Sequence, residues 1–154
     1  MTAAPVDVLT FECAGLRYAL PVDDVVEVLR ACALEPLAGA PGVVSGVINM
    51  RGQVVPVIDM RVRLGLTPKA IAPEDYFIVA RASNWRLALH VDQVHDLVRV
   101  VPTPVEHVAP LPDFRRRYLT GVAPTVDGTL LVQSLHSFLS FQEERALHTA
   151  LSGK

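Results

Sequence analysis

The chain of 154 residues is poor in the residue types on which several protein classes depend. Its two cysteines, Cys13 and Cys32, are too few for a disulfide framework, so we expect reduced thiols and an intracellular location. No apolar run reaches the roughly 18 residues that suggest a membrane-spanning helix. A formal net charge of −2 gives the whole chain no electrostatic reason to bind nucleic acid.

Lysine is scarce as well, because only Lys69 and Lys154 of the 14 basic residues are lysines and the other 12 are arginines. Arginine suits bidentate recognition of carboxylates and is common at the centres of interfaces. Codon bias in a GC-rich genome explains the same excess, so both explanations stay open. The triplet Arg115–Arg117 is interpreted as a solvated face, with phosphate binding as the alternative.

Signatures of catalysis and of cofactor binding are missing from the sequence. The five histidines lack the His-x-x-x-His spacing of a zinc site, and the two cysteines lack the Cys-x-x-Cys spacing, so no metal is expected. Glycine-rich nucleotide-binding loops are absent, and Ser45 lacks the first glycine of a nucleophile elbow. Asp59, Asp92 and Asp96 lie at strand ends, where aspartate is more often a turn or cap residue than an acid or base. The sequence predicts neither an enzyme nor a cofactor.

The chain contains enough apolar residues to form a core, since 51% of its residues are hydrophobic and 19% are charged. Many short apolar runs alternate with glycine and proline, which is typical of β-barrels or a sandwich. The predicted strands cover residues 8–13, 16–20, 43–49, 53–59, 76–81, 85–91, 118–123 and 129–132, with a further β-branched run at 22–29 and an apolar run at 94–101.

The C-terminal segment follows a helical period instead. Seven residues recur there at three- and four-residue spacing, all apolar except Gln142: Leu135, Phe138, Leu139, Gln142, Ala146, Leu147 and Ala150. This spacing predicts an amphipathic helix over 135–151.

An internal repeat relates Leu16–Arg30 to Trp85–Arg99, with seven identical residues in fifteen at an offset of 69. The identical pairs are Arg17/Arg86, Ala19/Ala88, Leu20/Leu89, Val22/Val91, Asp23/Asp92, Val25/Val94 and Arg30/Arg99. Further along, Ser45-Gly46-Val47 matches Thr120-Gly121-Val122 at an offset of 75, and Gly52 matches Gly128 at 76. Two matches in the same order favour a duplication.

The duplication predicts a mostly β fold of two small barrels of similar topology. We expect the lobes to cover 15–66 and 76–134 of one domain, with a first strand at 8–13 and the helix at 135–151. A half of about 70 residues is marginal as an independent core, so the two barrels should share a hydrophobic core.

The stretch from Gly46 to Leu66 has the most distinctive pattern in the chain. Two apolar runs flank Asn49-Met50-Arg51-Gly52, and Pro56 lies inside the second run. Proline removes a ladder donor and fits best at a sheet edge or a bulge. The pattern therefore suggests a turn that presents Arg51 beside a protected edge.

This stretch resembles the signature of the CheW-like adaptor family, Gly-Val-Ile-Asn-Leu-Arg-Gly followed by an apolar-Pro-apolar-apolar-Asp strand, with Met50 in place of the leucine. Three further segments are similar to family elements: Tyr18–Val28, Leu89–Val94 with Ala88 replacing a glycine, and Tyr118–Val122. The resemblance as a whole extends over about 8–139, nearly the whole chain.

The resemblance implies two five-stranded, SH3-like barrels around a shared core, and a scaffold that does no chemistry. It implies coupling of chemoreceptor cytoplasmic tips to the regulatory domain of a CheA-type histidine kinase, with other CheW-like proteins as further partners. A cytoplasmic chain recruited to membrane-associated receptor arrays is expected, without membrane insertion. A non-flagellar pathway (twitching motility, surface sensing or cyclic-dinucleotide output) is the alternative that the sequence leaves open.

Candidate site residues follow from the matched positions. Val25, Glu27 and Arg51 match positions tied to receptor binding. Candidates for kinase and ring contacts are Asn49, Arg51, Pro56 and Asp59. The alternative for Arg51 is an internal ion pair with Glu27 or Asp59. Gln133 and Ser134 depart from the family pattern, since an aliphatic residue is usual where Gln133 stands, and this departure could loosen the end of the second barrel or alter a ring contact.

Overall fold

The computed structural model describes residues 4–82, 85–104, 119–126 and 128–153. Its strands are β1 (Val6–Cys13), β2 (Leu16–Pro21), β3 (Val25–Arg30), β4 (Val44–Met50), β5 (Gln53–Asp59), β6 (Tyr76–Ala82), β7 (Trp85–Val91), β8 (Gln93–Val100), β9 (Thr103–Pro104), β10 (Leu119–Thr125) and β11 (Gly128–Gln133). Its helical segments are η1 (Val22–Asp24), α1 (Met60–Arg63), η3 (Leu135–Ser137) and α3 (Phe141–Ser152). The triplet Arg115–Arg117 lies outside the described residues.

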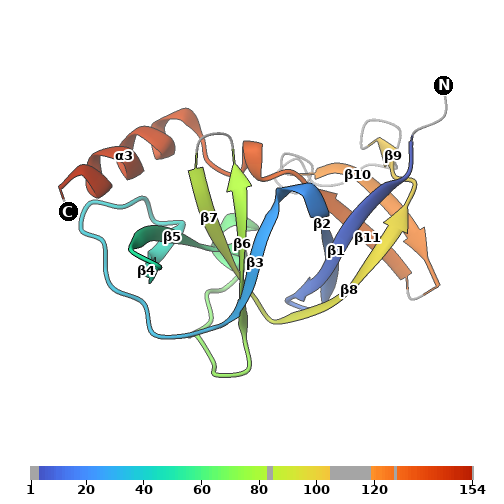
Figure 1. Cartoon of the computed structure of the whole chain (residues 1–154), viewed down its shortest axis with the longest axis horizontal. Helices are drawn as coiled ribbons and strands as arrows, with labels where there is room; N and C mark the ends of the chain where they lie inside the picture. The colour runs from blue at the N-terminus through green and yellow to red at the C-terminus, as the bar shows by residue number, and fades with distance from the viewer. Residues whose placement is uncertain (1–3, 83–84, 105–118, 127, 154) are drawn as a thin grey trace.

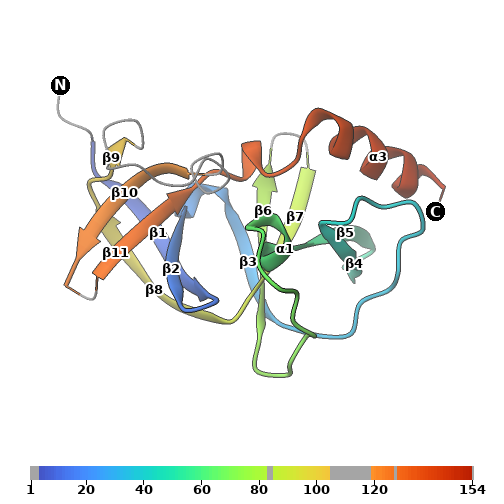
Figure 2. The ribbon, with the colours of Figure 1, turned by 180° about the vertical axis from the view of Figure 1, so that it is seen from behind.

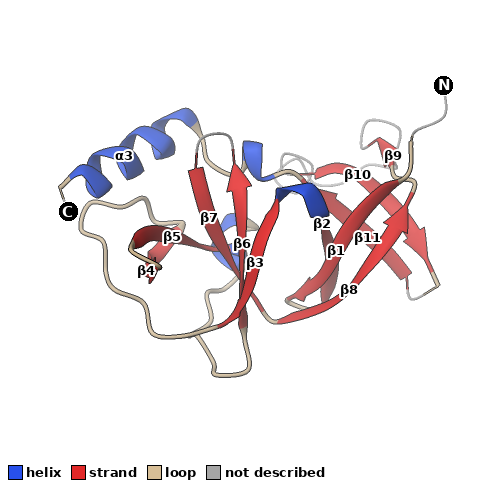
Figure 3. Cartoon of the chain, viewed as in Figure 1, coloured by secondary structure: helices blue, strands red, loops and turns tan. Residues whose placement is uncertain are grey.

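The strands form two separate sheets, which lie side by side (Figures 1 and 3). One has the order β3-β6-β7-β5-β4 and is called barrel I; the other has the order β8-β1-β2-β11-β10-β9 and is called barrel II. The expected mostly β fold of two SH3-like barrels with a helix at the C-terminus is confirmed.

The predicted lobe boundaries, 15–66 and 76–134, are wrong. The hairpin β1–β2 from the first half pairs with β8 and β11 of barrel II, and β6–β7 from the second half pairs with β3 and β5 of barrel I. The chain crosses between barrels at η1 and again at Asp92 (Figure 1). A repeat shows which segments are alike, but it does not say which copy each segment pairs with.

The two sheets nevertheless have the same strand order once β3, β6, β7, β5 and β4 are matched with β8, β1, β2, β11 and β10. Register agrees as well: Val57 lies opposite Ala88 in barrel I, and Val132 lies opposite Ala19 in barrel II, at the offsets of 75 and 69. The segments Leu16–Val28 and Trp85–Leu97 therefore occupy equivalent positions, as the repeat predicts.

Even the irregularities are duplicated. β4 has a register shift between Val44 and Gly46, and β10 has one between Leu119 and Gly121. A Cβ on Gly46 would lie 2.6 Å from the carbonyl oxygen of Glu35, and one on Gly121 would lie 2.8 Å from that of Thr103. Glycine is required at both bulges because another backbone passes so close.

The described residues form three apolar clusters. One lies inside barrel I and includes Phe77 and Val57; a second lies inside barrel II and includes Val8 and Val132. The third and largest joins residues of both barrels, Phe11 and Tyr18 from one and Leu89 from the other among them, and is the predicted shared core.

The C-terminal helix begins later than predicted. Residues 135–137 form the short η3, and α3 starts only at Phe141, where Ser140 and Glu143 make a capping box. Leu135, Phe138 and Leu139 are buried as expected, but from outside α3. Seen from behind in Figure 2, α3 extends over barrel I, and of its residues only Leu147 is fully buried.

Candidate functional site

The β4–β5 hairpin ends in the two-residue turn Arg51-Gly52, between the paired residues Met50 and Gln53. Both turn residues have a positive φ, 52° at Arg51 and 84° at Gly52, which is the type I′ geometry that suits the twist of a hairpin. The Asn49 side-chain oxygen accepts a hydrogen bond of 2.9 Å from the Gly52 amide. The side chain of the exposed Asn49, the second-last residue of β4, therefore stabilises the turn.

Arg51 is an unusual residue for the first turn position. The left-handed conformation costs a residue with a Cβ roughly 1–2 kcal/mol, and asparagine or glycine normally stands there. Its side chain is 77% exposed and makes one ion pair with the residues that the structure describes, with Nη2 3.3 Å from Oε1 of Glu27. An exposed pair of this kind contributes about 0–1 kcal/mol, too little to explain arginine at this position by stability.

Glu27 lies on β3, an edge strand of barrel I, which among the described strands pairs with β6 alone. A register shift between Val25 and Glu27 bends the strand there. Val25 is half-buried against the shared core, whereas the Glu27 carboxylate points to Arg51. The structure brings two of the three predicted receptor-binding residues into contact, and places Val25 nearby on the same strand.

Pro56 and Asp59 have roles within the chain. Pro56 is buried, opposite Val47 of β4 and one residue before β5 begins to pair with β7. It therefore avoids the β7 ladder, as an edge proline would, but β5 itself lies inside the sheet. Asp59 is the N-cap of α1, where Oδ1 accepts hydrogen bonds from the backbone amides of Arg61 and Val62. A contact of either residue with a partner stays a prediction.

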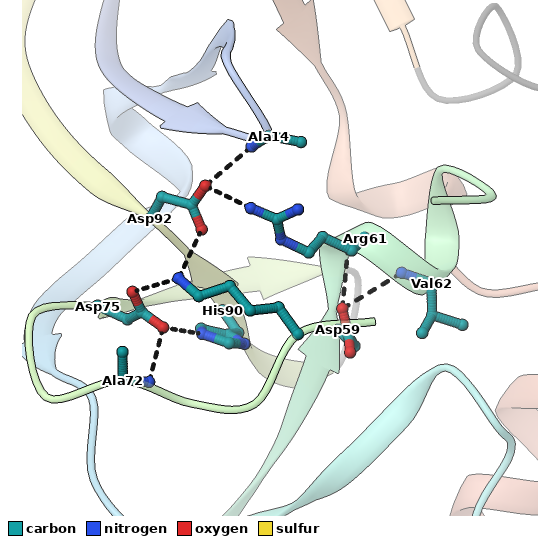
Figure 4. A network of polar contacts seen from close by, with 9 residues as sticks. Ala14, Asp59, Arg61, Val62, Ala72, Asp75, His90 and Asp92 are labelled. Atoms are coloured by element: carbon teal, nitrogen blue, oxygen red, sulfur yellow. Dashed lines mark hydrogen bonds and ion pairs between the residues drawn. The ribbon is translucent and has the colours of Figure 1, made fainter. Parts of the chain in front are cut away.

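A polar network joins the barrels where the chain crosses at Asp92 (Figure 4). Oδ2 of Asp92 accepts hydrogen bonds from Nη2 of Arg61 at 2.7 Å and from the Ala14 amide at 2.9 Å. Since Arg61 belongs to α1 and Ala14 to the β1–β2 turn, one carboxylate ties barrel I to barrel II. We call these three residues the Asp92 clamp.

Next to the clamp, Asp75 and His90 form a buried pair with an N–O distance of 2.8 Å. The Ala72 amide also donates to Asp75, and Lys69 lies 3.3 Å away. Burial raises the pKa of the Asp75 carboxyl, but the hydrogen bonds from Ala72, His90 and Lys69 outweigh burial and lower it below 3.8. The network is a structural brace for the loop that leads into β6.

A second ion pair fixes the C-terminal helix. Arg63 of α1 binds Glu143 through two nitrogens, at 2.8 and 2.6 Å, and donates to the carbonyl of Phe138. The hydrogen bonds from Arg63 chiefly lower the pKa of the Glu143 carboxyl against the opposing effect of burial. Arg63 therefore anchors the segment after barrel II to α1.

Comparisons with known proteins show which family has this sequence and architecture. The model of the CheW-like domain matches residues 7–142. The chain belongs to the CheW-like domain family. It is 26% identical to the chemotaxis protein CheW of Rhizobium meliloti over 141 residues, which is 91% of each chain. It is 33% identical to protein FrzA of Myxococcus xanthus over 115 residues, 73% of this chain and 70% of FrzA.

A solved structure has the same fold. The scaffolding protein TtCheW from Thermoanaerobacter tengcongensis superposes with a TM-score of 0.79 at 24% identity, over 91% of this chain and 96% of its own. As a CheW-like protein the chain is a non-catalytic scaffold or adaptor of chemotaxis signalling. Within the described residues no three His, Cys, Asp or Glu side chains gather as metal ligands, and no helix is long and apolar enough to cross a membrane.

Sequence patterns missed the residues that join the barrels. Arg61, Arg63 and Glu143 belong to no motif, and their pairing depends on the exchange of hairpins between barrels. One signal was available for Asp92, because the repeat aligns it with Asp23 at the other crossing. Its neighbours in the network come from distant parts of the chain, which no local pattern reveals.

Proposed function

We propose that this CheW-like chain couples the cytoplasmic tips of chemoreceptors to the regulatory domain of a CheA-type histidine kinase. In this role it works in the cytoplasm at membrane-associated receptor arrays, where other CheW-like proteins are further partners. Membership of the family and the CheW name of several relatives support the proposal.

The observation that carries the proposal is the Arg51 turn. Arg51 has a left-handed backbone conformation at the tip of the hairpin. Its side chain is 77% exposed and forms an ion pair of 3.3 Å with Glu27. Backbone strain of this kind persists where the surrounding structure enforces it, and it clusters at functional sites. The planar fork of donors fits a carboxylate or a carbonyl oxygen on a partner.

The residues divide by their accessibility. We propose that Arg51 and Glu27, with the accessible part of Val25, contact the receptor tip. Asn49 is exposed beside them and is the candidate for a contact with the kinase, together with Arg51. Pro56 and Asp59 support this surface from within, since one is buried and the other caps α1.

The test is a co-sedimentation assay with a receptor signalling tip and a CheA regulatory domain, each alone and then together. The proposal predicts that the wild-type chain binds each partner and increases their recovery in one complex. A folded chain that binds neither partner would contradict it.

A non-flagellar chemosensory pathway is the second candidate. It is favoured by the match to FrzA, a relative that does not carry the CheW name. Both candidates use the same docking surface, and they differ in the receptor and kinase that bind. Pull-downs with the receptor and kinase of each pathway in the source organism would separate them by which pair is retained.

A further inference from the structure

Gln133, the last residue of β11, is completely buried. Neither its Nε2 nor its Oε1 has a hydrogen-bond partner among the described residues. A buried amide without partners lowers the stability of the folded state, and such groups are rare enough in native proteins to call for an explanation.

The twofold relation between the barrels shows what usually fills this position. At the offset of 75, Gln133 corresponds to Ile58, which is fully buried in the shared core. Alternation along β11 puts Gln133 on the same face as Leu131, which packs against that core, and opposite to Val132, which faces the interior of barrel II. The unsatisfied amide is therefore at the joint between the barrels.

The two ends of this joint differ in their polar contacts. At one end Asp92 binds both Arg61 and Ala14. At the other end, at η1, the equivalent Asp23 is exposed and its carboxylate forms no ion pair with any residue that the structure describes. Its backbone carbonyl accepts a long hydrogen bond of 3.4 Å, from Arg81. The connection from β2 to β3 and the connection from β7 to β8 lie at opposite ends of the joint between the barrels (Figure 1).

The chain after Gln133 is held by the other barrel. Arg63 of α1 binds the carbonyl of Phe138 and the carboxylate of Glu143, so the segment that starts at η3 is fixed to α1 while β11 belongs to barrel II. Movement of one barrel against the other must therefore bend the chain close to Gln133.

We propose that the two barrels form a one-sided hinge, which opens at Gln133 and stays closed at the Asp92 clamp. Opening gives the Gln133 amide access to water and so removes the free-energy penalty of its burial. An equivalent opening at Ile58 would gain nothing of this kind, because that side chain is apolar. The device makes the angle between the barrels adjustable without unfolding either of them.

Two probes already in the chain distinguish local opening from global unfolding. Amide hydrogen exchange of a peptide covering 130–139 reports on the Gln133 side. Cys13 is buried in the shared core beside Ala14, so its reaction with a thiol reagent reports on the clamp side, and the exposed Cys32 serves as a reference in the same sample. Burial raises the pKa of the Cys13 thiol to about 12, so every variant is compared at one pH.

The decisive variant is Gln133→Met, which keeps the shape of the side chain and removes its polar atoms. We expect exchange in 130–139 to slow by about tenfold or more, because the open state no longer hydrates an amide, while labelling of Cys13 changes by less than twofold. Ile58→Gln is the matched control, since it places the same amide at the clamped side. It should accelerate labelling of Cys13 and exchange in 55–64, and leave the Gln133 side less affected.

Two results would overturn the hinge. If Gln133→Met leaves exchange in 130–139 unchanged, the amide does not control any opening. If it slows exchange in 130–139 and labelling of Cys13 by the same factor, Gln133 acts only on global stability. Should Ile58→Gln fail to fold, Gln133→Leu repeats the test on the Gln133 side with a branched side chain.

Discussion

The two barrels share strand order, register and bulges, yet they end their corresponding hairpins differently. Between Met50 and Gln53 barrel I has Arg51-Gly52; the corresponding paired residues in barrel II are Thr125 and Gly128, and Val126 takes the place of Arg51. Val126 is fully exposed, as a residue at a hairpin tip can be. The same frame thus presents a guanidinium group at the hairpin tip of barrel I and an aliphatic side chain at the hairpin tip of barrel II.

This difference shows that the duplicated frame and the docking chemistry are separable. Residues that are alike in both barrels maintain bulges, parallel pairings and the shared core. Among the residues that differ, Arg51 against Val126 and Ile58 against Gln133 are the ones to which we assign docking and movement. Changes in the buried cores should therefore affect stability, and changes at Arg51 or Gln133 should affect binding or dynamics.

The largest effect is expected in the barrel interiors. Phe77 fills barrel I at the position where barrel II has Val8, and both are fully buried. Phe77→Ala should cost about 3–5 kcal/mol of unfolding free energy, and Val8→Ala about 2 kcal/mol, because fewer buried atoms are removed. Urea denaturation followed by circular dichroism measures both. Equal losses would contradict the prediction that the larger buried side chain of Phe77 contributes more to stability than that of Val8.

A somewhat smaller effect is expected at Asp75. Asp75→Asn leaves His90 and Lys69 without their buried carboxylate and should cost about 3 kcal/mol near neutral pH. The carboxyl has a lower pKa in the folded chain than its ordinary 3.8, so its contribution is present above about pH 4 and is lost as pH falls through the folded value. The wild type should lose more stability than the variant between pH 5 and 3 in thermal melts. Parallel pH profiles would contradict this assignment.

A charge reversal at the docking surface should hardly change stability. Glu27→Lys removes one exposed pair with Arg51, so unfolding free energy should change by no more than about 1 kcal/mol. Affinity for the receptor tip, measured by titration, should fall at least tenfold. A strong drop in melting temperature with unchanged affinity of the folded fraction would show that Glu27 is structural.

Much of the frame was predictable because local patterns determine it. Strand positions, the hairpin β1–β2 and the equivalence of Leu16–Arg30 with Trp85–Arg99 followed from alternation and repetition. The exchange of hairpins did not, since alternation and repetition do not say which strands pair with one another. At the hairpin tips the match of Gly52 with Gly128 was also misleading, because the strand register aligns Gly128 with Gln53.

The candidate site was predictable only in part. The signature Asn49–Gly52 located the turn, and its contact with Glu27 was among the expected alternatives. That Pro56 is buried and that Asp59 caps α1 depends on how β5 is packed in three dimensions. The Asp92 clamp and the Arg63 anchor depend on residues about 30 and 80 positions apart, beyond any pattern of spacing.

The most direct test of the docking claim replaces Arg51 by asparagine, the residue that the type I′ turn prefers. Arg51→Asn keeps the hairpin and relieves the strain, so stability should rise by up to about 1 kcal/mol, while the guanidinium is lost. The measurement is co-sedimentation with receptor tip and kinase regulatory domain, with the melting temperature recorded for the same preparation and Arg51→Lys as the control for charge. We predict a chain at least as stable as wild type that no longer joins the complex, and weak recovery with lysine. Wild-type recovery of the complex by Arg51→Asn would contradict the account.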